Sequence, residues 1–231
     1  MFWYRRDPGT DGVGVAITSA GSDLSDPPSA RSRAFGELSE ELGVQIAVVR
    51  QVHGATVLDV DALEVGSGPL LDLTDHAADA LVTRRRRVAL AIRVADCIPV
   101  LFADPGAGVI GAAHAGRAGL LAGVVGATVE AMTGRGAERI VAWVGPHLCG
   151  SCYELPEDIV SDASARLGVA PSRTDWGTLA LDMTAAVVGQ LESLGVEADV
   201  LSGCTRSDPT LHSWRRDHED AGRQAGLVWL T

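Results

Sequence analysis

The sequence predicts an α+β fold, a single domain over residues 1–231 with central mixed β-sheets flanked by helices. Apolar, β-forming runs outnumber helical patterns and cluster in the middle of the chain, so they do not alternate with helices as in a parallel α/β sheet. A hydrophobic fraction of 46% over 231 residues is enough for one substantial core. No internal repeat or long linker divides the chain.

The expected strands are apolar runs bounded by turn residues. In chain order they cover Val13–Ala20, Ile46–Val60, Ala80–Thr83, Val88–Val94, Pro99–Ala103, Val109–Ala113, Ile140–Val144, Val200–Ser202 and Leu227–Leu230. The expected helices cover Ser29–Leu42, Gly116–Met132, Pro156–Leu167 and Asp182–Leu194. Glycines follow most of these helices, and an aspartate caps the last one. The polar stretch Asp23–Ser32 predicts a surface loop, and Arg84–Arg87 predicts a solvated hairpin tip.

The charge and composition narrow the classes of partner. A net charge of −11 opposes binding to nucleic acid and to anionic membranes, so neither is expected. A small anionic substrate would need a local basic pocket. All 19 basic residues are arginine and the chain contains no lysine or asparagine, which excludes Schiff-base and Walker-A lysines. The start of the chain lacks a secretory signal, and no apolar run reaches the roughly 18 residues of a spanning helix. We therefore expect a cytoplasmic protein; the sequence does not predict its oligomeric state.

Two short motifs have ordinary interpretations. Gly106, Gly108 and Gly111 form a G-x-G-x-x-G pattern, but the third glycine lies inside an apolar run, which favours a hairpin over a dinucleotide loop. Cys149 and Cys152 form a C-x-x-C with no second such pair and no H-x-x-x-H, which favours simple thiols in a loop. Four cysteines in a chain of this length do not indicate a disulfide scaffold.

His53, Cys97 and His114 each end an apolar run near small residues, where side chains can reach an open site. If they converge, two imidazoles and a thiolate would suit Zn²⁺ with one open coordination position. The same residues would also suit a cysteine nucleophile with a histidine base. Spacing alone does not decide whether they converge.

Eight ordered segments carry a family resemblance. They read RQVHGATV, ADALVT, VADCIPVLFADP, GVIGAAHAGRAGL, VGPHLCGSCYEL, LDMTAAV, CTRSDPTLHSWRRD and AGRQAGLVWL. Together they resemble the YfiH/laccase-domain family, also called the multicopper polyphenol oxidase family, from about residue 46 to the end of the chain. The resemblance implies mixed sheets with outer helices, similar to the catalytic domain of cytotoxic necrotizing factor toxins. It also implies a metal site, usually zinc, formed by His53, Cys97 and His114.

The activity that the resemblance implies is purine nucleoside chemistry. Family members phosphorolyse adenosine, inosine, guanosine and methylthioadenosine to base plus pentose 1-phosphate, and deaminate adenosine to inosine. Purine nucleosides and phosphate are thus the expected partners, and Asp96 is expected to orient a ligand or act as an acid or base. Arginine forks match phosphate, and the candidates are Arg50, Arg117, Arg215, Arg216 and Arg223. The chain departs from the family at H-A-G-R-A-G, where H-A-G-W-R-G is usual. Either Arg117 replaces the usual arginine from one position earlier, or the substrate range differs.

Two other activities compete with this one. Copper-dependent phenol oxidation, the older family label, needs more histidines and H-x-H pairs, which this chain lacks. Hydrolysis of an amide in a muramyl intermediate, an editing step for peptidoglycan precursors, is the alternative that the residues leave open. Phosphate separates them, because phosphorolysis requires it and the other two reactions do not.

Overall fold

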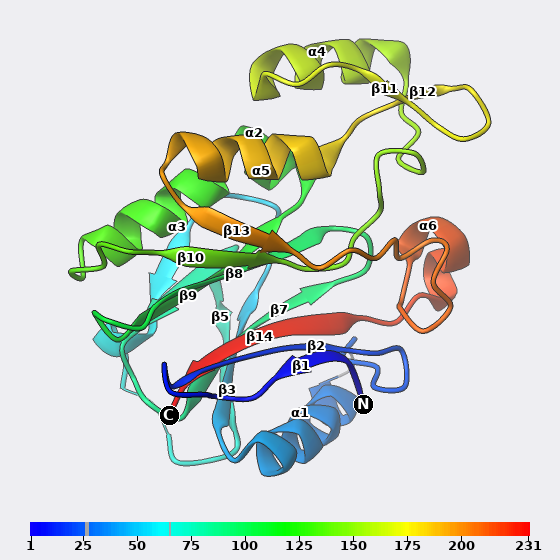
Figure 1. Cartoon of the computed structure of the whole chain (residues 1–231). Helices are drawn as coiled ribbons and strands as arrows, with labels where there is room; N and C mark the ends of the chain where they lie inside the picture. Colours follow the sequence, from blue (N-terminus) through cyan, green and yellow to red (C-terminus); the bar gives the residue numbers. More distant parts are fainter. Residues whose placement is uncertain (26–27, 65) are drawn as a thin grey trace.

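Two six-stranded sheets face each other, and helices lie on their outer sides (Figure 1). The computed structural model describes residues 1–25, 28–64 and 66–231. Each of the two sheets contains both parallel and antiparallel strand pairs. The predicted α+β class, with mixed sheets flanked by helices, is confirmed.

From the third strand to the eighth, successive strands lie in opposite sheets, whereas the strands before and after them stay in one sheet over several elements. The first sheet has the spatial order β1 (Phe2–Arg6), β2 (Val13–Thr18), β14 (Gln224–Leu230), β7 (Val88–Val94), β3 (Gln45–Arg50) and β5 (Leu70–Ala77). The second has the order β13 (Glu197–Val200), β10 (Val141–Val144), β8 (Ile98–Asp104), β9 (Val109–Ala115), β6 (Ala80–Thr83) and β4 (Val57–Asp59). A small ribbon pairs β11 (Ser172–Arg173) with β12 (Leu179–Ala180).

The core forms three apolar layers. The inner faces of the two sheets pack on each other through residues such as Ile92, Leu101 and Val228. Helix α1 (Pro28–Leu42) packs Phe35 and Leu38 against the outer face of the first sheet. The outer face of the second sheet is covered by α3 (Val124–Thr133) and α5 (Met183–Ser193). The other helical segments are α2 (Arg117–Leu121), α4 (Glu157–Leu167), α6 (Trp214–Asp217) and the 3₁₀ turns η1 (Val60–Ala62) and η2 (His218–Asp220).

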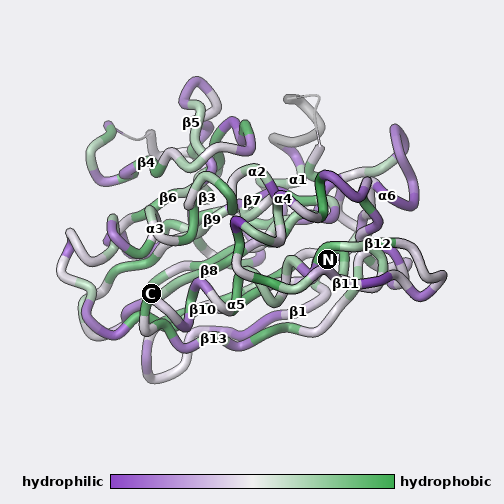
Figure 2. The backbone as a smooth tube through the Cα atoms, turned by 90° about the horizontal axis from the view of Figure 1, so that it is seen from above, coloured by the Kyte–Doolittle hydropathy of each residue, from purple (hydrophilic) through white to green (hydrophobic). Residues whose placement is uncertain are grey.

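Apolar runs predicted buried strands well. Strands β6 and β7 have the predicted bounds, and the run that includes Gly111 forms the second strand of the β8–β9 hairpin. Edge strands were missed or displaced. β1 and β5 were not predicted, and β13 shares only Val200 with the predicted strand Val200–Ser202. Edge strands carry exposed polar residues, which interrupt the apolar pattern; Figure 2 shows hydrophilic residues along β13 and in the peripheral loops.

Two long predicted elements were wrong as single units. The run Ile46–Val60 divides into β3 and β4, which lie in different sheets, with a loop at 51–56 between them. The expected helix Gly116–Met132 divides into α2 and α3 because Gly123 adopts a left-handed conformation with φ of 88°. In the loop predicted at 23–32, residues 26 and 27 lie outside the described residues, and α1 begins at Pro28.

The Arg84–Arg87 segment is not a hairpin tip, because β6 and β7 belong to different sheets. The segment carries the chain from the second sheet back to the first. Arg85 forms an ion pair with Asp61 and donates to the carbonyl of Leu63, and Arg87 donates to the carbonyl of Gly43. These arginines therefore brace a crossover. None of the described helices combines the length and apolar character needed to cross a bilayer.

Candidate active site

The candidate site forms at one end of the sandwich, where the chain crosses three times from the first sheet to the second. The crossovers are the loop 51–56 between β3 and β4, residues 78–79 between β5 and β6, and residues 95–97 between β7 and β8. They carry His53, Asp79 and Cys97 in turn. The end of β9 adds His114, which pairs with Pro99 of the neighbouring strand. Strand topology therefore brings together residues that are distant in the sequence.

His53, Cys97 and His114 form a compact cluster. One ligand atom from each lies within 4.8 Å of the other two. The Cys97 sulfur is 3.9 Å from His53 Nε2, and the two imidazole rings meet edge to face with centroids 4.7 Å apart. Imidazole nitrogen and thiolate sulfur are the donors that zinc prefers, and three protein ligands leave one position for water or substrate. The donor set thus fits a catalytic zinc site.

Asp79, which the sequence analysis did not assign, organises this cluster. It is fully buried and accepts hydrogen bonds from the backbone N–H groups of His53 at 2.8 Å and Gly54 at 2.7 Å. Its Oδ1 also lies 2.8 Å from His114 Nδ1. This contact fixes the orientation of the His114 ring and turns its Nε2 toward the other ligands, as carboxylates do for metal-bound histidines. The one sequence signal was an isolated acid beside an apolar run, in ADALVT.

The side chains at the cluster have shifted acidities. Burial opposes ionisation of the Cys97 thiol, but hydrogen bonds from His114 and His53 outweigh it and lower its pKa from 9.0 to about 6. Burial also opposes protonation of His114, but hydrogen bonds to Asp79 and Cys97 outweigh it and raise its pKa to about 9. Cys97 is therefore a thiolate at neutral pH, the form that binds metals.

The backbone around the cluster is tightly constrained. His53 has φ of 60° and Asp96 has φ of 84°, both in the left-handed region that non-glycine residues rarely adopt. A Cβ atom on Gly116 would lie 2.9 Å from His53 Cδ2 and 3.1 Å from the Cys97 sulfur. A Cβ on Gly119 would lie 2.9 Å from the carbonyl oxygen of Gly54. The two glycines of HAGRAG thus allow α2 to pack directly against the ligand loops.

A cavity of about 770 Å³ opens beside the cluster. Its walls include all three candidate ligands together with Asp96, Arg117, Arg215 and Arg223. Among the described residues, no carboxylate forms an ion pair with any of these three arginines. The cavity therefore combines a metal-ligand set with local positive charge in a chain whose overall charge is negative.

Two of the predicted arginines do not line this cavity. The guanidinium of Arg216 forms an ion pair with Asp217 and donates hydrogen bonds to the carbonyls of Thr205, Asp208 and Leu211. It therefore holds the C-terminal segment together. Arg50 is exposed at the end of β3, where its Nε donates to the carbonyl of Thr74. The geometry gives no support to either as a phosphate ligand.

Asp96 joins the end of β7 to the C-terminal segment. Its Oδ1 accepts from the hydroxyls of Thr205 and Ser213 at 2.6 and 2.7 Å, and its Oδ2 accepts from the backbone N–H of Arg215 at 2.6 Å. With three donors on its carboxylate, Asp96 positions the neighbouring Cys97 and Arg215 relative to each other. This arrangement favours the orienting role of the two that the sequence suggested.

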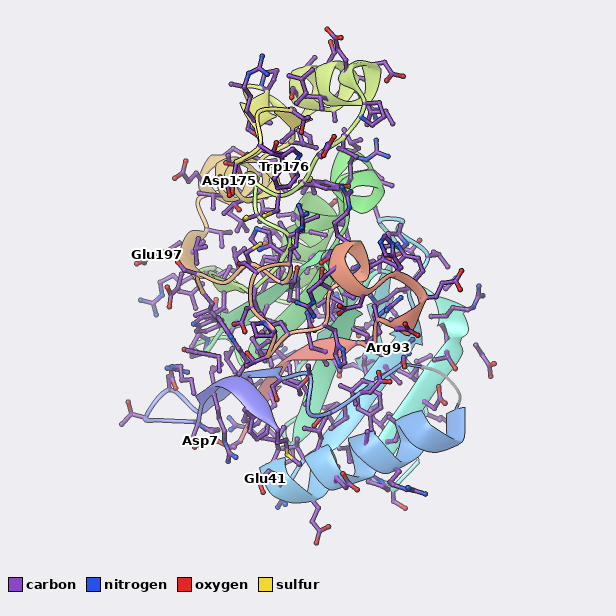
Figure 3. The ribbon with its side chains drawn as sticks, turned by 90° about the vertical axis from the view of Figure 1, so that its right-hand side faces the viewer. Asp7, Glu41, Arg93, Asp175, Trp176 and Glu197 are labelled. Carbon is purple, nitrogen blue, oxygen red and sulfur yellow. The ribbon has the colours of Figure 1, made fainter. Side chains whose placement is uncertain are left out.

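Aromatic and further polar side chains complete the cavity wall, and the sequence analysis had not singled them out. The guanidinium of Arg215 lies 5.4 Å from the ring centroid of Tyr153, and that of Arg223 lies 5.8 Å from that of Trp214. Arg93, labelled in Figure 3, also lines the cavity from β7, near α6. Trp214 is nearly half exposed, so its ring is available to a ligand.

Comparisons with known proteins identify relatives over nearly the whole chain. A family profile described as "Multi-copper polyphenol oxidoreductase laccase" matches residues 2–231. A purine nucleoside phosphorylase of Streptomyces coelicolor is 46% identical over 228 residues, covering 96% of this chain and 91% of that protein. A purine nucleoside phosphorylase of Corynebacterium glutamicum is 40% identical over 221 residues, covering 93% and 87%.

The fold also matches solved structures. The structure of the hypothetical protein YfiH of Bacillus licheniformis superposes with a TM-score of 0.82 at 25% identity, covering 95% of this chain and 93% of that one. The resemblance that the sequence motifs suggested thus extends over nearly the whole chain and to its three-dimensional structure.

Proposed function

We propose that this protein, which belongs to the laccase-like YfiH family, is a zinc-dependent purine nucleoside phosphorylase that also deaminates adenosine. The proposed substrates are adenosine, inosine, guanosine and methylthioadenosine, with phosphate as the second substrate. One observation carries the proposal. A single cavity is lined both by His53, Cys97 and His114 and by three arginines that form no ion pair with a carboxylate in the part of the chain that the structure describes.

The arginines of the cavity wall are the proposed ligands of phosphate. Phosphate carries up to two negative charges at neutral pH, and the overall charge of −11 repels it. Its binding therefore needs cationic donors gathered in one place. Arg117 enters the cavity at the start of α2, and Arg215 and Arg223 come from the C-terminal segment. Guanidinium forks bind phosphate oxygens in pairs and remain charged at all working pH values.

The remaining wall accounts for the nucleoside. A volume of about 770 Å³ lies within the usual range of roughly 300–1,000 Å³ for small-molecule sites. Tyr153 and Trp214 offer aromatic faces on which a flat purine can stack. Phosphate on the arginines and a base on an aromatic ring would place the ribose between them.

The chain's own residues have separate tasks around the reacting centre. His53, Cys97 and His114 would hold the metal, and Asp79 would keep the ring of His114 in place through its Nδ1 atom. Zinc held there would supply Lewis-acid polarisation of substrate groups and of water, which deamination needs. Asp96 would hold Arg215 at the correct distance from Cys97. Multicopper oxidation is a poor fit, because among the described residues the cluster contains two histidines and one cysteine.

Chromatographic analysis of products from adenosine, with and without phosphate, tests the proposal. The zinc-loaded protein is expected to give two kinds of product. Free base, as adenine from adenosine and hypoxanthine from the inosine formed, should appear only when phosphate is present, and inosine should appear in either condition. Cys97→Ala is expected to abolish both products, because it removes the thiolate ligand. His76→Ala, which changes an exposed histidine on β5, serves as the control and should leave both products unchanged.

Two results would contradict this proposal. Release of adenine at the same rate without phosphate would indicate hydrolysis. No product from any of the four nucleosides by the metal-loaded protein would exclude nucleoside chemistry and make the amide hydrolysis of a muramyl substrate the next reaction to test.

Replacing Arg117 with alanine should raise KM for phosphate by about 10- to 100-fold, since a hydrogen bond to a charged group contributes roughly 1.5–3 kcal/mol. Deamination does not use phosphate and should keep its rate within a factor of about two to three. Steady-state kinetics of both reactions on the same preparation would measure this difference. Arg166→Ala on the exposed side of α4 is the matched control. Equal losses in both reactions would instead place Arg117 in substrate positioning or in folding of the site.

A further inference from the structure

A second cluster of metal-binding side chains lies outside the cavity. Cys149 and Cys152 follow β10, and Cys204 comes from the segment after β13. All three are free thiols, and their sulfur atoms lie within 4.8 Å of one another. In the sequence, Cys149 and Cys152 resemble simple loop thiols, because the chain has no second C-x-x-C and no H-x-x-x-H. Strand topology supplies a third ligand from 52 positions beyond Cys152, as Cys204 lies next to both.

Backbone hydrogen bonds fix the two segments that carry these cysteines. His147 and Cys204 form a parallel bridge in which the His147 N–H donates to Gly203 and the Thr205 N–H donates back to His147, at 3.2 and 3.0 Å. The N–H of Cys152 donates to the carbonyl of Cys149 at 2.9 Å and closes the C-x-x-C turn. The spacing of the three sulfurs is therefore set by the fold.

The spacing suits a thiolate-bound cation. With zinc–sulfur bonds of about 2.3 Å, tetrahedral coordination holds sulfur atoms roughly 3.8 Å apart. Sulfurs that already lie within 4.8 Å of each other reach this spacing through small side-chain rotations. Cys152 is buried, whereas Cys149 and Cys204 are partly exposed, so a cation can enter from solvent and meet a buried third ligand.

The three sulfurs lie too close together to carry three negative charges without a partner. Three neighbouring thiolates would repel each other strongly unless a cation neutralised them.

We propose that Cys149, Cys152 and Cys204 form a second metal site, which binds a thiophilic divalent cation such as Zn²⁺ through three thiolates. Each thiol releases its proton to solvent when the cation binds, and water fills the fourth position. Among the described residues, no fourth histidine, cysteine or acid joins the cluster. His147 is engaged elsewhere, because its ring nitrogens contact the Gly145 carbonyl and the Thr184 hydroxyl.

A cation here would fasten one wall of the cavity. Tyr153 follows Cys152 directly, and its ring lines the cavity. Thr205 follows Cys204 and donates to Asp96, which in turn holds the backbone of Arg215. The second site is therefore structural: it connects the loop that carries Tyr153 to the segment that leads to the C-terminal arginines.

Cobalt titration of the reduced, metal-free full chain tests this inference, because thiolate-to-cobalt charge-transfer bands grow with the number of thiolate ligands. Cys97→Ala, which weakens the cavity site but leaves this cluster intact, is expected to bind one Co²⁺ per chain. Its charge-transfer absorbance per bound ion should be about three times that of the Cys204→Ser protein, whose remaining complete site has one thiolate. The double variant Cys97→Ala/Cys204→Ser should bind neither ion.

Thermal unfolding provides a second readout that does not depend on spectra. Zn²⁺ should raise the Tm of the Cys97→Ala protein, and Cys149→Ser, at a partly exposed position, should remove that increase without unfolding the chain. The inference would be overturned if the Cys97→Ala protein bound no Co²⁺. It would also be overturned if mass measurement found a disulfide within the cluster that persists under the reducing conditions of the titration. Because neither readout uses nucleosides, failure here would leave the proposed function untouched.

Discussion

Replacing Asp79 with asparagine is expected to weaken zinc binding by about 10- to 100-fold and to lower the free energy of unfolding by roughly 3 kcal/mol. Asp79 is fully buried and is the shared acceptor for the backbone of the His53 loop and the ring of His114. An asparagine keeps the shape of the side chain but presents one amide group to these donors. At least one of the present donors, a backbone N–H or the ring N–H of His114, would then face the amide NH2 group, which is also a donor.

Asp104→Asn is the matched control for this experiment. Asp104 is also buried and accepts backbone N–H groups of Ala107, Glu138 and Arg139 at 2.7–3.0 Å, but it does not line the cavity. Both variants should unfold at lower denaturant concentration, and only Asp79→Asn should lose zinc affinity, as measured by competition with a chromophoric chelator. Wild-type zinc affinity in folded Asp79→Asn protein would mean that Asp79 supports the fold without orienting the ligands.

Replacing Gly14 with alanine is expected to lower the free energy of unfolding by about 3 kcal/mol, the upper end of the usual cost of overpacking. Gly14 on β2 lies directly opposite Trp229 on β14, and the indole covers the space where a side chain would stand. A Cβ at position 14 would lie 2.1 Å from Trp229 Cε2. Trp229 is almost completely buried against α1 and its neighbours, so it has little room to move.

A double-mutant cycle with Trp229→Phe isolates this contact. The smaller ring leaves space near position 14, so Gly14→Ala should cost much less in that background, as measured by urea unfolding. Gly126→Ala is the control, since a Cβ there meets no atom within 4 Å and the residue lies inside α3. It should be neutral or stabilising by up to about 1 kcal/mol. Equal costs of Gly14→Ala in both backgrounds would assign the effect to the strand backbone.

The sequence predicted the buried strands and the fold class because apolar periodicity reports burial directly. It did not predict how the strands divide between two sheets, since the loop after Arg50 and the segment Arg84–Arg87 give no sequence signal for crossing from one sheet to the other. That division decides which residues meet. For this reason the convergence of His53, Cys97 and His114 rested on family resemblance, and Asp79, which acts through backbone N–H groups, was not found.

The arginines illustrate the same limit at a smaller scale. Arg215 and Arg216 are adjacent and equivalent in the motif SWRRD, yet the rotation of about 100° between consecutive helical residues directs the first to the cavity and the second toward the carbonyls of its own segment. Arg50 precedes the His53 loop in sequence, but it remains on the exposed end of β3. Which of several arginines meets a ligand depends on local backbone direction, and composition does not carry that information.

The position of β14 has a consequence for how the protein is made. This strand comprises residues 224–230, and it lies in the interior of its sheet, between β2 and β7. During synthesis β2 and β7 emerge from the ribosome long before β14. Until β14 is made, the backbone N–H and C=O groups along their facing edges have no strand to pair with. The hairpin of β1 and β2 joins the rest of the sheet only through β14. Long-range pairing of this kind slows folding and exposes strand edges to aggregation. Loss of β14 would therefore leave two unpaired strand edges that can pair with other chains, and a β1–β2 hairpin separated from the rest of its sheet.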